Sequence, residues 1–471
     1  MVFSSITFLF VFLPVVLLIY LPLRNITARN IFLLLSSLFF YYWGEPSFLV
    51  VMLSSILWNY LGGLLCGTVR NERARKLFLF LAVAGNLALL AVFKYLDFGI
   101  HILNILLRSD IAYRNIALPI GISFFTFQGL SYVIDVYRRQ VLPQKNPLYI
   151  ALYISMFPQL IAGPIVRYID VEKQLTHRSV TTDKFYLGIQ RFTVGLFKKA
   201  VIANTLALPA DNIFALNVAG TLSCSLAWLG AVLYTLQILF DFSGYSDMAI
   251  GLGHMLGFTF AENFREPYTS RSVREFWRRW HISLSTWFRD YVYIPMGGSR
   301  SGNVYLHLLI VFFLTGLWHG AAFNFIAWGL WHGAFLLLER LWSKKHTLRN
   351  PESILIKAGQ HVYTMFVVLI GCVFFRSEGL SLALPYLKSM FFSLAAAPCD
   401  ISFFVDLPTL FVLLLAIVLS TGVPAKLGQW CENRSPIIYL IGKNLGVVAL
   451  LLLSAVFVMT STYSPFIYFR F

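Results

Sequence analysis

Residues 1–23, MVFSSITFLFVFLPVVLLIYLPL, form an apolar stretch that contains no charged side chain. A helix that crosses a bilayer needs roughly 20 mostly apolar residues, and this stretch is long enough. It lacks both the positive start and the clear small-residue cleavage site of a signal peptide, and another apolar run follows at once. We therefore predict that it is retained as the first transmembrane helix.

Similar apolar runs recur along the whole chain of 471 residues, of which 58% are hydrophobic and only 12% charged. The further runs lie near residues 31–43, 48–66, 77–97, 117–135, 147–166, 186–203, 223–257, 304–318, 321–341, 361–375, 402–420 and 436–460. A soluble domain carries about twice this share of charge, and a β-barrel would show short alternating segments. The sequence predicts an all-α polytopic membrane protein with about ten to twelve spans. The run 223–257 could form two spans or one broken helix.

The charges indicate which loops face the cytoplasm. Lys and Arg exceed Asp and Glu by 37 − 21 = 16, which in a membrane protein reflects loops near an anionic leaflet rather than nucleic-acid binding. The loops at 24–29 and 69–76 are basic, whereas the turn at Glu45 between them is not. We predict that the N-terminus lies outside and that both basic loops lie in the cytoplasm.

The sequence shows no boundary between domains. The longest stretch between apolar runs, residues 259–303, has 45 residues, which is short for a separate domain. Gly-x-Ser-x-Gly, Walker A, Gly-x-Gly-x-x-Gly and His-Glu-x-x-His motifs are absent, and the five cysteines have no metal-ligand spacing. We predict one integral-membrane domain over residues 1–471, with its chemistry inside or at the edge of the helix bundle and no metal site.

Residues 262–300 combine many charges with many aromatic residues. If the segment is one helix, its two faces differ in polarity. One face carries Trp277, Trp280, Leu284, Trp287 and Tyr291, and the other carries Arg274, Arg278, His281, Ser285 and Arg289. Such a basic amphipathic helix is typical of the cytoplasmic membrane interface. An interfacial anchor does not need an imidazole, so His281 is a candidate functional residue.

His319 and His332 each lie in a GLWHG pentapeptide within apolar sequence. On one continuous helix they would lie about 20 Å and about 220° apart and would not share a site. Gly316 and Gly320 favour a helix break beside His319, and broken helices often carry the reactive polar groups of membrane proteins. For His332, a hydrogen bond to a neighbouring helix is the simpler interpretation.

A third polar cluster, LFDFSGYSDMAIG at residues 239–251, places Asp241 and Asp247 on either side of Ser243-Gly244-Tyr245. The pattern resembles another broken helix. Carboxylates inside a membrane are costly unless they are paired or functional. These two could pair with the arginines of 271–289, orient a histidine or bind a cation.

Several of these motifs together resemble the membrane-bound O-acyltransferase (MBOAT) family. They are EFWRRWHISLSTWFRDYVYIPMGG at 275–298, GLWHG at 316–320, FDFSGYSDMAIGLG at 240–253 and PQLIAGPIVR at 158–167. The opening MVFSS and the segment 118–138 resemble the bacterial branch that contains the alginate O-acetyltransferase membrane subunit. The resemblance covers most of residues 1–342, with a motif-bearing core at about 118–342.

The resemblance implies a ring of about 11 transmembrane helices around a central tunnel, with short interfacial helices on the cytoplasmic side. The signature histidine of the family maps onto His319. A second polar residue, 38 positions upstream, maps onto His281, where many eukaryotic members have asparagine. The candidate tunnel and substrate-binding residues are then Trp318, Asp241, Tyr245, Asp247, Arg278, Ser285, Asn324 and His332.

The resemblance also implies the reaction. An acetyl group from cytoplasmic acetyl-CoA would pass through the bacterial inner membrane toward hydroxyls of an alginate-like exopolysaccharide or peptidoglycan. A periplasmic or membrane-tethered serine esterase-like partner would complete the transfer, and no bound cofactor is expected. A neutral His319 suits a general base, and His281 could orient it or stabilise the oxyanion. Whether His319 also carries the acyl group stays open, as do two other functions: a proton-coupled transporter or exporter, and D-alanyl transfer to teichoic acid.

Overall fold

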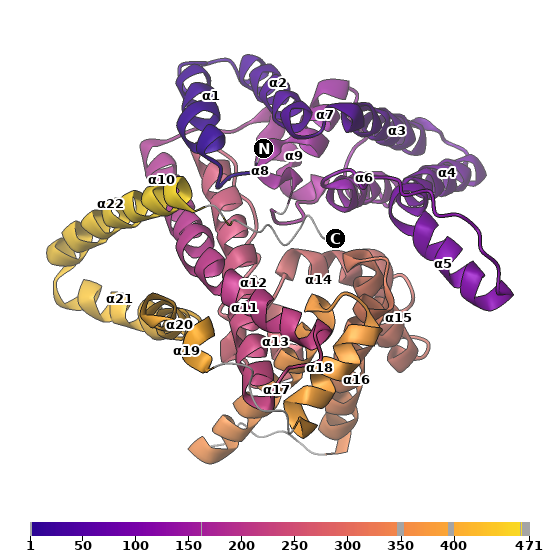
Figure 1. The fold of residues 1–471 in the computed structure, drawn as a ribbon. Coiled ribbons are helices and arrows are strands. Elements are labelled where there is room, and N and C mark those ends of the chain that lie inside the picture. Colours follow the sequence, from indigo (N-terminus) through magenta and orange to yellow (C-terminus); the bar gives the residue numbers. More distant parts are fainter. Residues whose placement is uncertain (1, 162, 346–352, 394–399, 462, 464–471) are drawn as a thin grey trace. The chain divides into compact units, whose positions relative to one another are not determined.

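The computed structural model describes residues 2–161, 163–345, 353–393, 400–461 and 463, and every regular element among them is a helix (Figure 1). The predicted all-α polytopic class is confirmed. The chain divides into two compact units, residues 1–192 with 246–261 and residues 193–245 with 262–471. The long helix α12 (Cys224–Met255) contributes residues to both units. Each unit is described separately.

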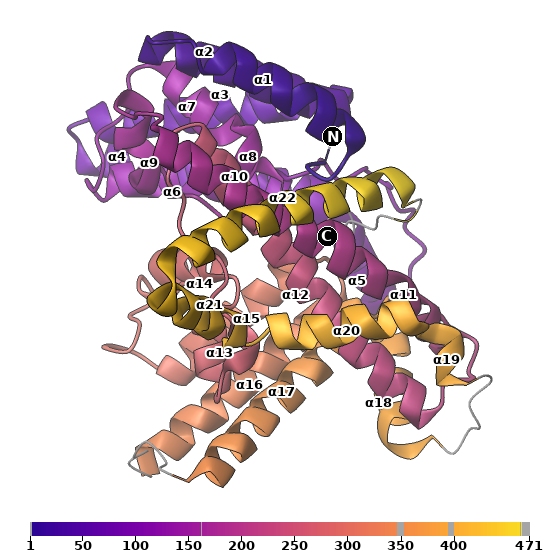
Figure 2. The same ribbon diagram turned by 90° about the vertical axis from the view of Figure 1, so that its left-hand side faces the viewer.

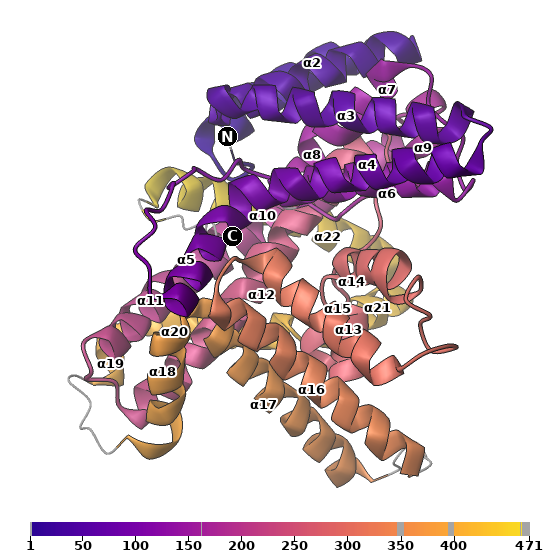
Figure 3. The same ribbon diagram turned by 90° about the vertical axis from the view of Figure 1, so that its right-hand side faces the viewer.

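The first unit contains the N-terminal helices. They are α1 (Leu13–Tyr20), α2 (Ile26–Gly44), α3 (Leu49–Thr68), α4 (Glu72–Leu90), α5 (Leu96–Leu107), α6 (Ile122–Tyr137), α7 (Pro147–Ser155), α8 (Phe157–Leu160), α9 (Tyr168–Thr176) and most of α10 (Thr182–Phe197). Helices α3, α4 and α6 lie side by side (Figure 3). The side chains of Asn59 on α3 and Asn86 on α4 exchange two hydrogen bonds of 3.1 and 2.8 Å. These bonds satisfy two amides that are buried between apolar helices.

The second unit contains the remaining helices. They are α11 (Asn204–Val218), α13 (Val273–Arg279), α14 (Ile282–Phe288), α15 (Val304–His319), α16 (Phe323–Lys345), α17 (Ile354–Arg376), α18 (Leu380–Phe392), α19 (Ile401–Phe404), α20 (Leu407–Leu419), α21 (Val423–Arg434) and α22 (Pro436–Thr460). Helices α16 and α17 lie side by side (Figure 2). The indole N–H of Trp331 on α16 donates a 2.9 Å hydrogen bond to the carbonyl of Val367 on α17.

Two glycines allow α15 and α16 to approach closely. A Cβ atom on Gly316 would lie 2.3 Å from the carbonyl oxygen of Phe325, and one on Gly329 would lie 2.2 Å from that of Phe312. Both distances are well below van der Waals contact. Close approach through small residues is the usual way in which helices pack in membranes. It fixes the position of the C-terminal end of α15, which carries His319.

Six helical segments in the described part of the chain are long and apolar enough to cross a membrane. They are Pro46–Thr68, Glu72–Leu107, Thr182–Val218, Cys224–Met255, Ile354–Arg376 and Pro436–Thr460. The pair α20–α21, bent by 70°, gives a seventh, and three shorter apolar helices lie at Phe8–Tyr20, Val304–His319 and Leu380–Phe392. The protein is therefore multi-pass, and the total of about 11 spans stays a prediction.

The apolar run 223–257 forms neither two spans nor a broken helix. It contains one continuous helix of 32 residues, α12, and the predicted break at Ser243-Gly244-Tyr245 is wrong. Gly244 serves packing instead, because a Cβ atom there would lie 2.8 Å from the carbonyl oxygen of Gly195 on α10. A small residue inside a buried helix thus marks a close helix contact here.

Candidate active site

His319 is the last residue of α15, and the chain turns sharply after it. Gly320 has an extended backbone, and α16 begins only at Phe323. A Cβ atom on Gly320 would lie 2.2 Å from the ring of Phe325, so the turn requires glycine. The predicted helix break beside His319 is confirmed. It leaves the imidazole at a helix end, where it is 5% exposed.

The chain around His281 is not one helix, contrary to the prediction for residues 262–300. Helix α13 ends at Arg279 and α14 begins at Ile282. The preceding extended segment bonds to this junction: the carbonyl of Asn263 accepts from the Ile282 amide, and the Arg265 amide donates to the Arg279 carbonyl, both at 3.0 Å. The Ile282 amide and the Arg279 carbonyl therefore bond to the extended segment instead of to the next turn of a continuous helix.

The amphipathic character predicted for the segment is nevertheless present. Trp277, Trp280, Leu284, Trp287 and Tyr291 are all buried, whereas Arg274, Arg278 and Arg289 are exposed. The break at Trp280 and His281 allows the imidazole to join the buried side.

His281 is completely buried, and its backbone is left-handed, with φ 43° and ψ 54°. Its Nδ1 lies 3.2 Å from Oδ1 of Asn263. Its ring centroid lies 4.6 Å from that of Phe242 on α12 and 6.3 Å from that of His319. Burial lowers the pKa of His281 to about 3, so the ring is neutral at pH 7.

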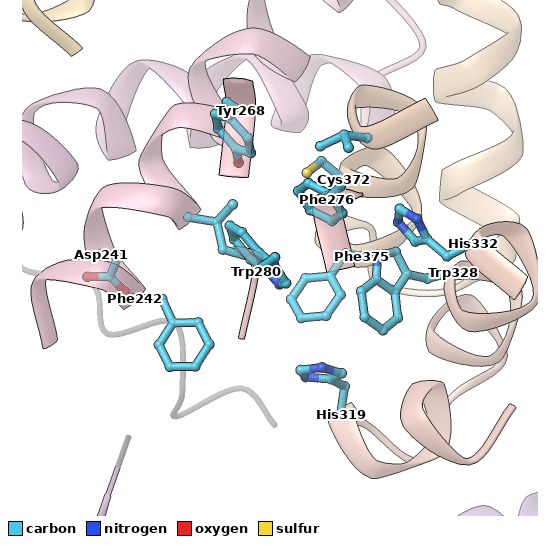
Figure 4. A pocket seen from close by; sticks show the side chains of 12 residues that line it. Asp241, Phe242, Tyr268, Phe276, Trp280, His319, Trp328, His332, Cys372 and Phe375 are labelled. Atoms are coloured by element: carbon cyan, nitrogen blue, oxygen red, sulfur yellow. The ribbon is translucent and has the colours of Figure 1, made fainter. Parts of the chain in front are cut away.

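An enclosed cavity of about 30 Å³ lies beside these residues. It has room for one or two waters. Its lining is almost entirely apolar and aromatic, and Figure 4 shows most of it. The lining residues are Ile238, Asp241, Phe242, Tyr268, Phe276, Trp280, His319, Trp328, His332, Val368, Cys372 and Phe375. His281 contacts two of these residues, Phe242 and His319.

His319 and His332 line the same cavity because α15 and α16 are separate helices. The ring of Trp328 lies between them, with centroids 4.9 Å from His319 and 5.4 Å from His332 (Figure 4). His332 also stacks on Phe276 at 6.0 Å. The separation expected for one continuous helix therefore does not apply. His332 lines the candidate cavity through ring contacts, and its predicted hydrogen bond to a neighbouring helix stays a prediction.

The two aspartates pair with bases from α10 and the π-helical turn after it, rather than with the arginines of 271–289. In the second unit, Asp241 lies 2.5 Å from Nζ of Lys199, and both side chains are at most 3% exposed. In the first unit, Asp247 lies 2.7 Å from the guanidinium of Arg191. Of the three possibilities considered for these carboxylates, the structure shows pairing, although with other bases than the arginines of 271–289. Asp241 also lines the cavity.

The other predicted residues have varied positions in the second unit. Trp318 contacts both histidines, with ring centroids 4.9 Å from that of His319 and 6.0 Å from that of His281. The side-chain amide of Asn324 donates to the carbonyls of Phe374 and Ser377, so it stabilises the end of α17. The last three are Tyr245, which is buried in α12, Ser285, which is half-buried, and Arg278, which is exposed.

Asn263 and most of the aromatic lining could not be recognised from the sequence alone. Asn263 lies 18 residues before His281 in an extended segment, and no local spacing rule connects the two. Phe276, Trp328 and Phe375 read as ordinary apolar residues in the sequence. Only their gathering around one cavity gives them a role.

The model of the membrane-bound O-acyltransferase family matches residues 125–376, which include every cavity-lining residue. The chain belongs to this family, as its motifs predicted, and it is a membrane-bound acyltransferase.

Individual relatives within the family can also be compared with this chain. The chain is 45% identical over 399 residues to a probable alginate O-acetylase, AlgI, of Pseudomonas putida, covering 83% of this chain and 80% of that one. It is 33% identical to a peptidoglycan O-acetyltransferase of Helicobacter pylori, over 100% of this chain and 98% of that one. A teichoic acid D-alanyltransferase of Bacillus subtilis is 29% identical, over 50% and 62%.

Proposed function

We propose that the protein transfers acetyl groups from acetyl-CoA toward hydroxyls of an exported polysaccharide, either an alginate-like exopolysaccharide or peptidoglycan. The observation that carries the proposal is the pair of buried imidazoles, His281 and His319, with ring centroids 6.3 Å apart beside an apolar cavity. The similarity to O-acetylating enzymes of alginate and peptidoglycan supports the acceptor class.

The chemistry requires a base in a dry site. The acceptor hydroxyl attacks the thioester carbonyl carbon while a neutral imidazole, assigned to His319, takes the hydroxyl proton. The tetrahedral intermediate collapses, the C–S bond breaks, and the CoA thiolate leaves and receives the proton back from the imidazolium. His281 lies beside His319 and assists at the same centre. The mostly apolar lining leaves room for only one or two waters, which limits hydrolysis of the thioester.

The direction of transfer follows from the predicted topology. We place the protein in the bacterial inner membrane with its N-terminus outside, so that the donor enters from the cytoplasm. The acceptor polysaccharide lies on the other side. A periplasmic or membrane-tethered serine esterase-like protein therefore receives the acetyl group and passes it on.

The first test is release of CoA from radiolabelled acetyl-CoA by the purified protein, with and without the partner encoded by a neighbouring gene. We expect release that depends on the partner, with label on the partner or on added polysaccharide. No release under either condition would contradict an acetyl-CoA donor. D-alanyl transfer, suggested by the teichoic acid relative, predicts instead that only a carrier-bound thioester reacts.

A cavity of about 710 Å³, lined by residues at the start of α13 and by residues of α16 and α17, is a suitable site for the nucleotide end of the donor. Arg271 and Arg274 can meet phosphates, and Trp342 and Tyr363 can stack on adenine. The volume lies within the usual range of small-molecule pockets.

Replacing both Arg271 and Arg274 by glutamine is expected to raise the KM for acetyl-CoA about tenfold and to leave kcat nearly unchanged. Contacts to the remote phosphates bind ground state and transition state equally. Initial rates at varied acetyl-CoA measure this split. Arg300→Gln, on an exposed loop, is the matched control. An unchanged KM for acetyl-CoA in the double variant would contradict the binding of the nucleotide in this cavity.

A further inference from the structure

The side-chain oxygen of Asn263 is a buried acceptor that lies within hydrogen-bond distance of three polar atoms. Oδ1 accepts from the backbone N–H of Ser283 at 3.2 Å and from the Ser283 hydroxyl at 2.9 Å. Nδ1 of His281 lies 3.2 Å from the same oxygen. Asn263 is 1% exposed and His281 is fully buried, so bulk water does not compete for these contacts.

These contacts determine which nitrogen of His281 carries the proton. A backbone N–H can only donate, so the atom of Asn263 that faces Ser283 must be the oxygen. The same oxygen faces Nδ1 of His281. If Nδ1 were unprotonated, two lone pairs would oppose each other at 3.2 Å in a buried site, so Nδ1 must be the donor. A neutral imidazole then leaves Nε2 unprotonated.

Nε2 of His281 has no hydrogen-bond partner within the described residues. The ring lies against Phe242 and His319, both of which line the cavity. An unprotonated nitrogen in this position can accept a proton or a hydrogen bond, and it cannot donate one.

We propose that Asn263 is a positioning residue that holds His281 in the Nδ1-protonated tautomer, so that Nε2 is the hydrogen-bond acceptor of the imidazole pair. This deepens the proposed function and rests on it for the reaction. It also selects between the two roles considered for His281. A nitrogen without a proton cannot stabilise an oxyanion, so His281 orients His319 or the hydroxyl by accepting a hydrogen bond.

The backbone at this junction supports the assignment. His281 is one of five non-glycine residues with positive φ among those that the structure describes. A left-handed conformation is unfavourable for a non-glycine residue, so it persists only where surrounding contacts hold it. The two backbone bonds from Asn263 and Arg265 hold the conformation in place, and Asn263 supplies both a backbone and a side-chain contact.

Three variants test the role of Asn263 in acetyl transfer. Asn263→Leu removes the acceptor and is expected to lower kcat about 10- to 100-fold with little change in KM. Asn263→Asp keeps an acceptor for Nδ1–H and is expected to retain most of the activity. Ser283→Ala leaves the Asn263 oxygen and the Ser283 amide in place, so we expect at most a small loss.

The pH dependence of activity in Asn263→Asp distinguishes a positioning role of Asn263 from a purely structural one, which would leave that dependence unchanged. A carboxylate beside Nδ1–H raises the pKa of His281, and only the neutral ring is active. The loss of activity on acidification should therefore begin at a higher pH in Asn263→Asp than in the wild type. The other titratable side chains on the elements around His281 include His319 on α15, Glu262, the Lys199–Asp241 pair, and Glu275 and the three arginines of α13, and they are the same in both proteins.

The tautomer can be observed without any activity. Long-range ¹H–¹⁵N spectra of protein labelled with [¹⁵N]histidine distinguish the two neutral tautomers, and the signal missing in His281→Gln identifies His281. We expect Nδ1 to be protonated in the wild type. An Nε2-protonated ring would overturn the proposal, as would wild-type kcat in Asn263→Leu. If the tautomer is as expected but acetyl-CoA is not turned over, the proposed function fails and the tautomer assignment stands. If Asn263→Leu does not fold, the wild-type spectrum alone decides.

Discussion

Replacement of His319 by alanine is expected to reduce acetyl transfer by about 10²- to 10⁴-fold, the range that a general base contributes. The imidazole lies at the end of α15, against the rings of Trp318, Trp328 and Phe375. The other bases beside the cavity, His281, His332 and Asp241, are each held by their own contacts and cannot take the place of His319. Initial rates of CoA release with saturating acetyl-CoA and partner measure the effect.

The matched control is His307→Ala. His307 lies near the start of the same helix, is also buried, and hydrogen-bonds the carbonyl of Gly298 through Nδ1 at 3.1 Å. It does not line the cavity. We expect this variant to keep wild-type kcat. If His319→Ala is correctly inserted in the membrane and fully active, the assignment of His319 as the base is wrong. If it is absent from the membrane while His307→Ala is normal, the ring has a packing role.

Replacement of Lys199 by methionine is expected to destabilise the protein by about 3–5 kcal/mol, because it leaves the Asp241 carboxylate buried without its cation. The two groups lie 2.5 Å apart and are almost inaccessible. Thermal unfolding of the purified protein in detergent would show a marked decrease in Tm.

The stability of the double variant Lys199→Met with Asp241→Leu is compared with that of Lys199→Met alone. An apolar pair of similar volume removes both charges, so most of the lost stability should return. A double variant as unstable as Lys199→Met would contradict this account. The same variant tests the transport alternative, because a proton-coupled transporter would lose its coupling carboxylate and hence its activity. CoA release, in contrast, does not require Asp241 to take up and release a proton.

The hydropathy of the sequence predicted the class of fold because each membrane helix satisfies its own backbone. It failed where helix ends depend on tertiary contacts. The apolar run near 186–203 extends in the structure to Val218, through Pro209 and Asp211. These two residues look like a helix end in the sequence. In the folded protein Asp211 pairs with Arg376 of α17, which compensates its charge.

The candidate site, like the fold, could be predicted from the sequence only where the signal is local. Gly320 next to His319 predicts a break in the helix from local sequence alone, and the structure has this break. His281 was recognised as a misfit, but its conformation depends on an extended segment that begins 18 residues earlier, with Asn263. No periodicity within residues 262–300 contains that information. The pairing of Asp241 with Lys199 likewise joins residues more than 40 positions apart.

The left-handed backbone of His281 also limits how this position can change during evolution. Among residues other than glycine, Asn, Asp and His are enriched in this region of backbone space, whereas β-branched residues are strongly disfavoured there. Of these three, Asn and His fill the buried position without introducing a carboxyl group. The backbone therefore restricts the choice before any chemistry is selected. Asparagine satisfies the same backbone preference, so this junction would accept Asn in place of His281 without a change of conformation.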